Sequence, residues 1–61
     1  MGWQPISTAP DRRLVWTKID DGDGVRNVQQ LQRRGRLWFT SDGGMYVYYT
    51  PTHWSPSRPV Q

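Results

Sequence analysis

The stretch Arg36-Leu37-Trp38-Phe39-Thr40-Ser41-Asp42-Gly43-Gly44-Met45-Tyr46-Val47-Tyr48-Tyr49-Thr50 decides the fold of this chain. It holds two runs of β-branched and aromatic residues on either side of an Asp-Gly pair, which is a strong short-range signal for a β-hairpin. We therefore predict strands near 36–40 and 45–50. Pro51 ends the second strand, because proline has no N–H to donate to a strand ladder.

Toward the N-terminus, residues 13–19 also favour a strand. The segment Leu14-Val15-Trp16-Thr17 is aliphatic, β-branched or aromatic throughout, and Ile19 continues the pattern. Both alternating faces are partly apolar, so we expect both sides of this strand to be covered. The run Asp20-Asp21-Gly22-Asp23-Gly24 then supplies the residues that a tight turn between strands requires.

Residues 25–34 fit two structures. Val25, Val28 and Leu31 recur at a spacing of three, and the intervening Gln and Arg residues are good helix formers. The neighbouring strands favour a strand instead. Gly35 is compatible with both, since glycine follows the last turn of many helices and also serves in hairpin turns. The residues alone leave the two alternatives open.

The composition limits the chain to one small domain without covalent staples. Its 61 residues contain no cysteine and a single histidine, His53, which excludes disulfides and cysteine-based metal sites. A chain of this size buries only about 60% of the surface that it exposes when unfolded, so large aromatic side chains have to supply much of the core. We therefore expect the structural core to be formed by Trp3, Trp16, Trp38 and Trp54.

Together these patterns predict a single all-β domain over residues 1–61. We expect an antiparallel meander of about four strands, near 13–19, 25–34, 36–40 and 45–50, with extended termini. Residues 55–61 are rich in proline and are expected to be a frayed tail. The N-terminus lacks the charged and apolar regions of a signal peptide, and no apolar run approaches the length of a membrane span. These features predict a cytoplasmic protein with no membrane partner.

Two motifs at the ends of the chain resemble the signatures of a phage and prophage family of unknown function. The opening is Trp3-Gln4-Pro5-Ile6-Ser7-Thr8-Ala9-Pro10-Asp11, and the closing motif is Pro51-Thr52-His53-Trp54-Ser55-Pro56. Leu14-Val15-Trp16 and Leu37-Trp38 are similar to the middle elements of that family. The chain departs from the family at Asp11-Arg12-Arg13, which replaces an Asp-Gly pair, and at Ser55-Pro56-Ser57-Arg58-Pro59, where two apolar anchors are missing. The resemblance implies a small β domain in which residues 25–34 are a strand, and it implies no activity.

Arginines and tyrosines form the candidate binding surface. Alternation along a strand places Tyr48 and Tyr49 on opposite faces, so at least one tyrosine must lie outside the core. Tyrosine and arginine are enriched at protein interfaces. The predicted surface consists of Arg33, Arg34, Arg36, Tyr46 and Tyr48. We expect it to bind an unknown protein partner or a second copy of the chain.

Single-stranded nucleic acid is the alternative partner, because basic groups beside aromatic faces can hold phosphates and stacked bases. The formal charge of only +3 and the lack of an RNA-recognition motif favour the protein partner. In this alternative, the protein binds single-stranded nucleic acid weakly and with little sequence preference.

The sequence predicts a protein that is not an enzyme and has no cofactor or metal site. His53 has no specified partners for general-base catalysis, and a ring packed on an aromatic neighbour is the simpler interpretation. Asp20, Asp21 and Asp23 are similar to the start of a calcium loop. A loop counted from Asp21 would end with Gln32 where a glutamate ligand is required.

Overall fold

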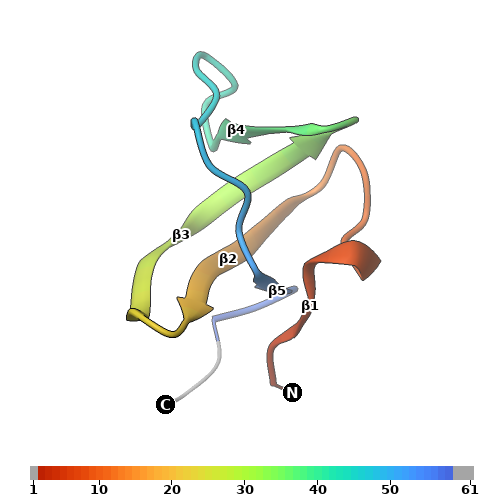
Figure 1. Ribbon diagram of the computed structural model, residues 1–61. Coiled ribbons are helices and arrows are strands. Elements are labelled where there is room, and N and C mark those ends of the chain that lie inside the picture. The colour runs from red at the N-terminus through yellow and green to blue at the C-terminus, as the bar shows by residue number, and fades with distance from the viewer. Residues whose placement is uncertain (1, 59–61) are drawn as a thin grey trace.

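The computed structural model describes residues 2–58 and shows an all-β domain, as the sequence predicts. A single antiparallel sheet of five strands has the order β1-β5-β2-β3-β4 (Figure 1). The strands are β1 (Gln4–Pro5), β2 (Leu14–Asp21), β3 (Gly24–Arg34), β4 (Leu37–Thr40) and β5 (His53–Ser55). A short 3₁₀ helix, η1 (Ile6–Thr8), follows β1.

Strands β2 and β3 form the long central hairpin. Val15 lies opposite Leu31, and Asp21 lies opposite Gly24 across a two-residue turn. The Asp21 carboxylate accepts a hydrogen bond from the Asp23 backbone N–H at 2.9 Å, which fixes this turn. The expected strand over residues 25–34 is therefore confirmed, because pairing Leu31 with Val15 buries both side chains on one face.

The strand expected at residues 45–50 is wrong, although the predicted turn before it is present. Thr40 N–H bonds to Met45 C=O, Val47 N–H bonds to Trp38 C=O, and an isolated bridge joins Phe39 to Tyr46. Pairing then stops because β5 must reach β2 on the far side of β3. Residues 46–52, here called the crossing segment, run across the sheet to do so (Figure 1).

The crossing segment and residues 3–13, here called the leader, cover one face of the sheet. The core consists of the buried residues Ala9, Val15, Leu31 and Trp38. Partly buried side chains from the leader, the crossing segment and β5 pack against it: Ile6, Val47, Tyr49 and Trp54. The second layer of this domain is therefore irregular chain rather than another sheet.

The four tryptophans do not form the core together. Trp38 is 3% exposed, whereas Trp54 is half-buried at the margin of the core. Trp3 and Trp16 are half-buried and lie outside the core cluster, which corrects the expectation for both. Alternation explains Trp16: its neighbour Val15 takes the covered face, so the indole of Trp16 lies on the other face.

The N-terminal and C-terminal motifs form one structural unit. Strand β1 pairs with β5, which places Gln4 opposite Trp54. Trp54 Nε1 donates a hydrogen bond to Thr8 Oγ1 at 2.9 Å, and Ile6 N–H bonds to Thr52 C=O at 3.0 Å. Each end of the chain therefore supplies the partners that hold the other.

The tail after β5 is docked as far as the structure describes it. Ser55 is fully buried, and its hydroxyl donates to Ser57 C=O at 2.6 Å. The Arg58 guanidinium lies 5.2 Å from the centre of the Trp16 ring, within cation–π range. The expected fraying is therefore wrong for residues 55–58, and 59–61 lie outside the described residues.

A contact between Lys18 of β2 and Trp3 holds the start of the leader against β2. Lys18 is only 8% exposed, and its Nζ lies 3.0 Å from the Asp20 carboxylate and 4.8 Å from the centre of the Trp3 ring. Carboxylate and ring together compensate the cation for the loss of water. Trp3 therefore covers a buried charge and does not fill the core.

Candidate functional site

On the face of the sheet opposite the core, the part around β4 is accessible. Four residues lie directly opposite one another on neighbouring strands, so their side chains share this open face: Leu14, Gln32, Phe39 and Tyr46. Leu14 is 42% exposed and Tyr46 is 45% exposed. Leu37 adds a side chain that is 44% exposed. Apolar and aromatic surface is therefore displayed beside β4.

Three aromatic rings continue this surface past the β4 edge. Phe39 and Tyr46 pack edge to face with ring centroids 6.0 Å apart, and Tyr46 packs in the same way on Tyr48 at 5.5 Å. Such pairs stabilise each other beyond the area that they bury. We call Phe39, Tyr46 and Tyr48 the aromatic ladder. Its last ring, Tyr48, is 91% exposed.

An arginine covers the inner end of the aromatic ladder. The Arg34 guanidinium carbon lies 4.7 Å from the centre of the Phe39 ring, and Arg34 Nε donates to Gln32 Oε1 at 2.9 Å. These two contacts hold the planar group over the ring while leaving Arg34 exposed. A charged group therefore joins the aromatic surface at a defined position.

A groove lies where the crossing segment separates from β4. Its volume is about 210 Å³. The lining comes from β4 and the residue before it on one side and from the crossing segment on the other: Arg36, Leu37, Trp38, Tyr46, Val47, Tyr48, Tyr49 and Thr50. We call it the edge groove. Two rings of the aromatic ladder thus also form one wall of a concave surface.

The structure brings together four of the five predicted surface residues. Arg34 adjoins the ladder through Phe39, and Arg36, Tyr46 and Tyr48 line the edge groove. Arg33 does not belong to this surface. It is half-buried, and its Nη1 donates to Ala9 C=O at 2.8 Å, which ties the leader to β3.

Phe39 is the member of the site that sequence reasoning missed. Its signal was present, because pairing across the Asp42-Gly43 turn places residues on either side of the turn opposite each other. In the structure that register joins Phe39 to Tyr46. Reading the two predicted strands as separate runs, rather than as a pair in register, hid this contact.

The turn before Tyr46 is fixed by Asp42. Its carboxylate accepts hydrogen bonds from the Thr40 hydroxyl at 2.6 Å and from the Gly44 N–H at 2.9 Å. These bonds hold the pKa of Asp42 below its usual value, because they stabilise the charged form. Gly43 has φ of +75°, and a Cβ there would lie 3.1 Å from Arg34 Nη2. The turn thus positions both the ladder and its arginine.

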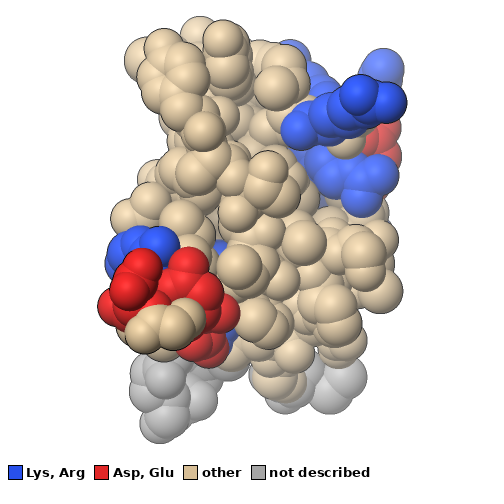
Figure 2. Space-filling model, viewed as in Figure 1, with Lys and Arg blue, Asp and Glu red and all other residues tan. Residues whose placement is uncertain are grey.

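Opposite charges gather at the two ends of the sheet. Figure 2 shows blue side chains at the end where β3 passes into β4 and red side chains at the β2–β3 turn. At the β2–β3 turn, the Arg26 guanidinium forms a bidentate ion pair with the Asp21 carboxylate, with hydrogen bonds of 2.9 and 3.1 Å. This contact lowers the pKa of Asp21. Positive charge therefore adjoins the edge groove, and the acidic turn lies remote from it.

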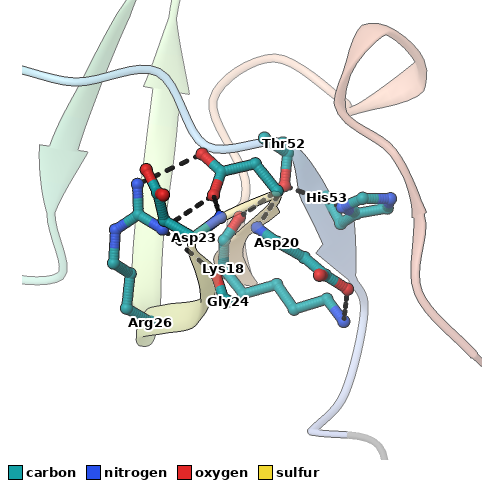
Figure 3. A network of polar contacts seen from close by, with 8 residues as sticks. Lys18, Asp20, Asp23, Gly24, Arg26, Thr52 and His53 are labelled. Carbon is teal, nitrogen blue, oxygen red and sulfur yellow. Dashed lines mark hydrogen bonds and ion pairs between the residues drawn. The ribbon is translucent and has the colours of Figure 1, made fainter.

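His53 belongs to a structural network, seen in Figure 3. Its Nδ1 lies 2.7 Å from Thr52 Oγ1, which also accepts a hydrogen bond from the Asp20 backbone N–H at 2.8 Å. The Thr52 N–H bonds to Lys18 C=O at 2.9 Å. This network joins the start of β5 to β2. Within residues 2–58, no cluster of three or more histidines and carboxylates is arranged to hold a metal ion.

Comparison of the chain with protein-family models, curated proteins and solved structures finds no match in any of the three. Among residues 2–58 there is also no helix with the length and apolar character needed to cross a membrane. The functional argument therefore rests on the geometry of the aromatic ladder and the edge groove.

Proposed function

We propose that this chain is a non-enzymatic interaction module that binds another protein through the aromatic ladder, Arg34 and Arg36. Tyr48 is the observation that carries the proposal: its side chain is 91% exposed, yet its ring is held edge-on against Tyr46. A tyrosine held in this way offers a large contact area with little conformational entropy left to lose. Tyrosine and arginine are also the residues in which binding hot spots are enriched.

The edge groove supports binding over catalysis. Its volume of about 210 Å³ is smaller than the roughly 300–1,000 Å³ of typical small-molecule sites. The described residues that line it include no histidine or carboxylate, so no side chain there is suited to act as a general acid or base near neutral pH. A shallow groove with an aromatic wall is suited to contact with a protein chain.

Single-stranded nucleic acid is the second candidate, favoured by the stacking of Arg34 on Phe39. Charge disfavours it. Arg34 lies against the turn that carries the Asp42 carboxylate, and Arg36 is the only other cation that adjoins the described ladder and groove. Tracking a phosphate backbone takes several cations, so a protein partner suits this surface better.

We extend the proposal to origin and location: the chain derives from the phage and prophage family that its terminal motifs resemble and acts in the cytoplasm. The support for the origin is the pair of motifs, which β1 and β5 join into one unit through Gln4 and Trp54. The support for the location is the cysteine-free sequence, which is compatible with a reducing compartment.

Selection from a displayed library of random peptides tests the interaction module. We expect enriched peptides to lose about thirtyfold or more in affinity with Tyr48→Ser, since truncating a hot spot costs at least about 2 kcal/mol. Val25→Ser is the matched control, because Val25 is 54% exposed beside the β2–β3 turn. Peptides that bind both variants equally would contradict the proposal. Oligonucleotide binding that falls steeply with added salt would favour the second candidate.

A further inference from the structure

The outer edge of β4 is only partly paired. Three backbone hydrogen bonds join it to the turn and the chain beyond: Thr40 N–H to Met45 C=O and Gly43 N–H to Thr40 C=O, both at 2.8 Å, and Val47 N–H to Trp38 C=O at 2.9 Å. In the part of the chain that the structure describes, no further backbone bond links β4 to the crossing segment. Because the N–H and C=O of one strand residue point to the same side, the Trp38 N–H also faces this edge.

The edge groove lies beside this unpaired stretch. It is lined by Trp38 and Leu37 on the β4 side and by Tyr48 on the other side. At roughly 30 Å³ of liquid volume per water, about 210 Å³ holds about seven waters, comparable to one or two residues of extended chain. The groove thus joins one backbone donor, the Trp38 N–H, for which no backbone acceptor is seen among the described residues, to an apolar wall.

A second unpaired stretch on the β4 side of the sheet, in β3, is protected against strand addition. Strand β3 continues past the region that pairs with β4, so its residues 24–30 have no neighbour on that side among the described strands. Asn27 in this stretch has φ of +57°, and the register of β2 and β3 shifts there. A bulge of this kind twists an edge away from pairing. The β4 edge has no such feature in its paired register.

The charge beside the edge groove indicates the character of a ligand. Arg36 lines the groove, and Arg34 stacks on the adjoining ladder ring Phe39. Both arginines are exposed, and they flank Gly35 at the connection from β3 to β4, the end of the molecule at which Figure 2 shows blue side chains. A segment with carboxylates flanking its apolar positions would pair with both guanidinium groups.

We propose that the ligand is an extended acidic segment of a partner protein, which adds as a strand to the β4 edge beside Trp38. This inference rests on the proposed interaction module and names its binding mode. Main-chain hydrogen bonds to the free edge supply affinity, and alternate side chains contact the aromatic ladder and the arginines.

Nuclear magnetic resonance titration with a short capped peptide of alternating glutamate and valine tests the inference. We expect the backbone signals of Arg36, Leu37 and Trp38 to shift and the Trp38 amide to exchange more slowly with solvent. A peptide of alternating lysine and valine is the charge control. A peptide of alternating glutamate and proline is the backbone control, because each lost N–H bond of about 1 kcal/mol weakens binding about fivefold.

The variant Arg36→Glu should bind the glutamate–valine peptide more weakly and the lysine–valine peptide more tightly than the unchanged protein does. Shifts confined to the acidic turn, or equal binding of the three peptides, would overturn strand addition. Library peptides that still depend on Tyr48 but leave the Trp38 amide unchanged would overturn this inference alone. If no library peptide depends on Tyr48, the interaction module itself fails.

Discussion

The two faces of one sheet use the same kinds of residue for opposite purposes. On the covered face, Trp38 is 3% exposed and packs with Leu31 under the crossing segment. On the open face, Phe39 and Tyr46 stay accessible and are ordered by contact with each other and with Arg34. Aromatic content alone therefore does not locate a core. The core lies on the face that the leader and the crossing segment cover.

A chain of 61 residues has enough remaining length to cover one face. Leader residues such as Ile6 and crossing residues such as Val47 all pack on the same side. The opposite face is covered in part on its β2–β5 side, where Trp3 lies over Lys18 and Arg58 lies over Trp16. Within residues 2–58, these segments leave Tyr46 and Tyr48 of the aromatic ladder exposed.

The largest effect should come from comparing Trp38→Ala with Trp16→Ala by urea denaturation. We expect Trp38→Ala to cost about 3–5 kcal/mol, because it empties a filled core. That approaches the whole stability of roughly 3–9 kcal/mol expected for 61 residues. Trp16→Ala should cost about 1–2 kcal/mol, because its ring keeps part of its contact with water.

If Trp38→Ala does not fold, Trp38→Phe and Trp16→Phe give the same comparison in graded form. Equal losses for the two positions would show that the two faces are packed alike, and the distinction between them would fail.

The next largest effect concerns the turn that orients the open face. Gly43→Ala should cost about 1–2 kcal/mol, because φ of +75° is strained for any residue with a Cβ and because Arg34 must move. Gly22→Ala is the matched control, since its Cβ would meet nothing within 4 Å. Thermal unfolding measures both. A Gly22→Ala loss as large as that of Gly43→Ala would argue against this account of the turn.

A smaller effect should come from the joint between the two ends of the chain. Trp54→Phe and Thr8→Val each remove one side of the hydrogen bond from Nε1 to Oγ1. We expect a coupling of about 1 kcal/mol in a double-mutant cycle, the typical net contribution of one such bond. Strictly additive losses would mean that the two motifs contribute independently.

The smallest effect is the pH dependence of the Asp42 turn. The pKa of Asp42 is lowered in the folded protein, so its contribution is complete above the ordinary value of 3.8 and is lost as the pH falls through the lowered pKa. Unfolding by urea at several pH values below neutrality should show less acid sensitivity for Asp42→Asn. An unchanged acid sensitivity in that variant would contradict the assignment.

Local signals in the sequence predict most of the sheet. The Asp-Gly pair predicts the turn after β4, and the strand formers of residues 13–19 predict β2. Residues 25–34 of β3 fit a helix as well, and only the neighbouring strands and the family resemblance favour a strand there. The missing part is topological: nothing local in Met45-Tyr46-Val47-Tyr48-Tyr49-Thr50 says that β5 must pair with β2. Only that long-range pairing turns a strong strand sequence into a crossing segment.

The candidate site was predictable to the same degree. Tyr46, Tyr48, Arg34 and Arg36 follow from residue type and alternation. Arg33 could not be separated from them by sequence, because its removal from the surface depends on a leader carbonyl that lies far away in the chain, at Ala9. Burial by a distant segment is invisible to any short window of sequence.

The central claim is that one face of this sheet is covered and that the part of the other face beside β4 is accessible. An inert, water-soluble paramagnetic agent tests it by broadening the proton signals of accessible side chains. We predict strong broadening for the rings of Phe39, Tyr46 and Tyr48 and for the methyl groups of Leu37. The signals of Val15, Leu31 and Trp38 should stay sharp. Equal broadening on both faces, or protection of the three ladder rings, would contradict the account.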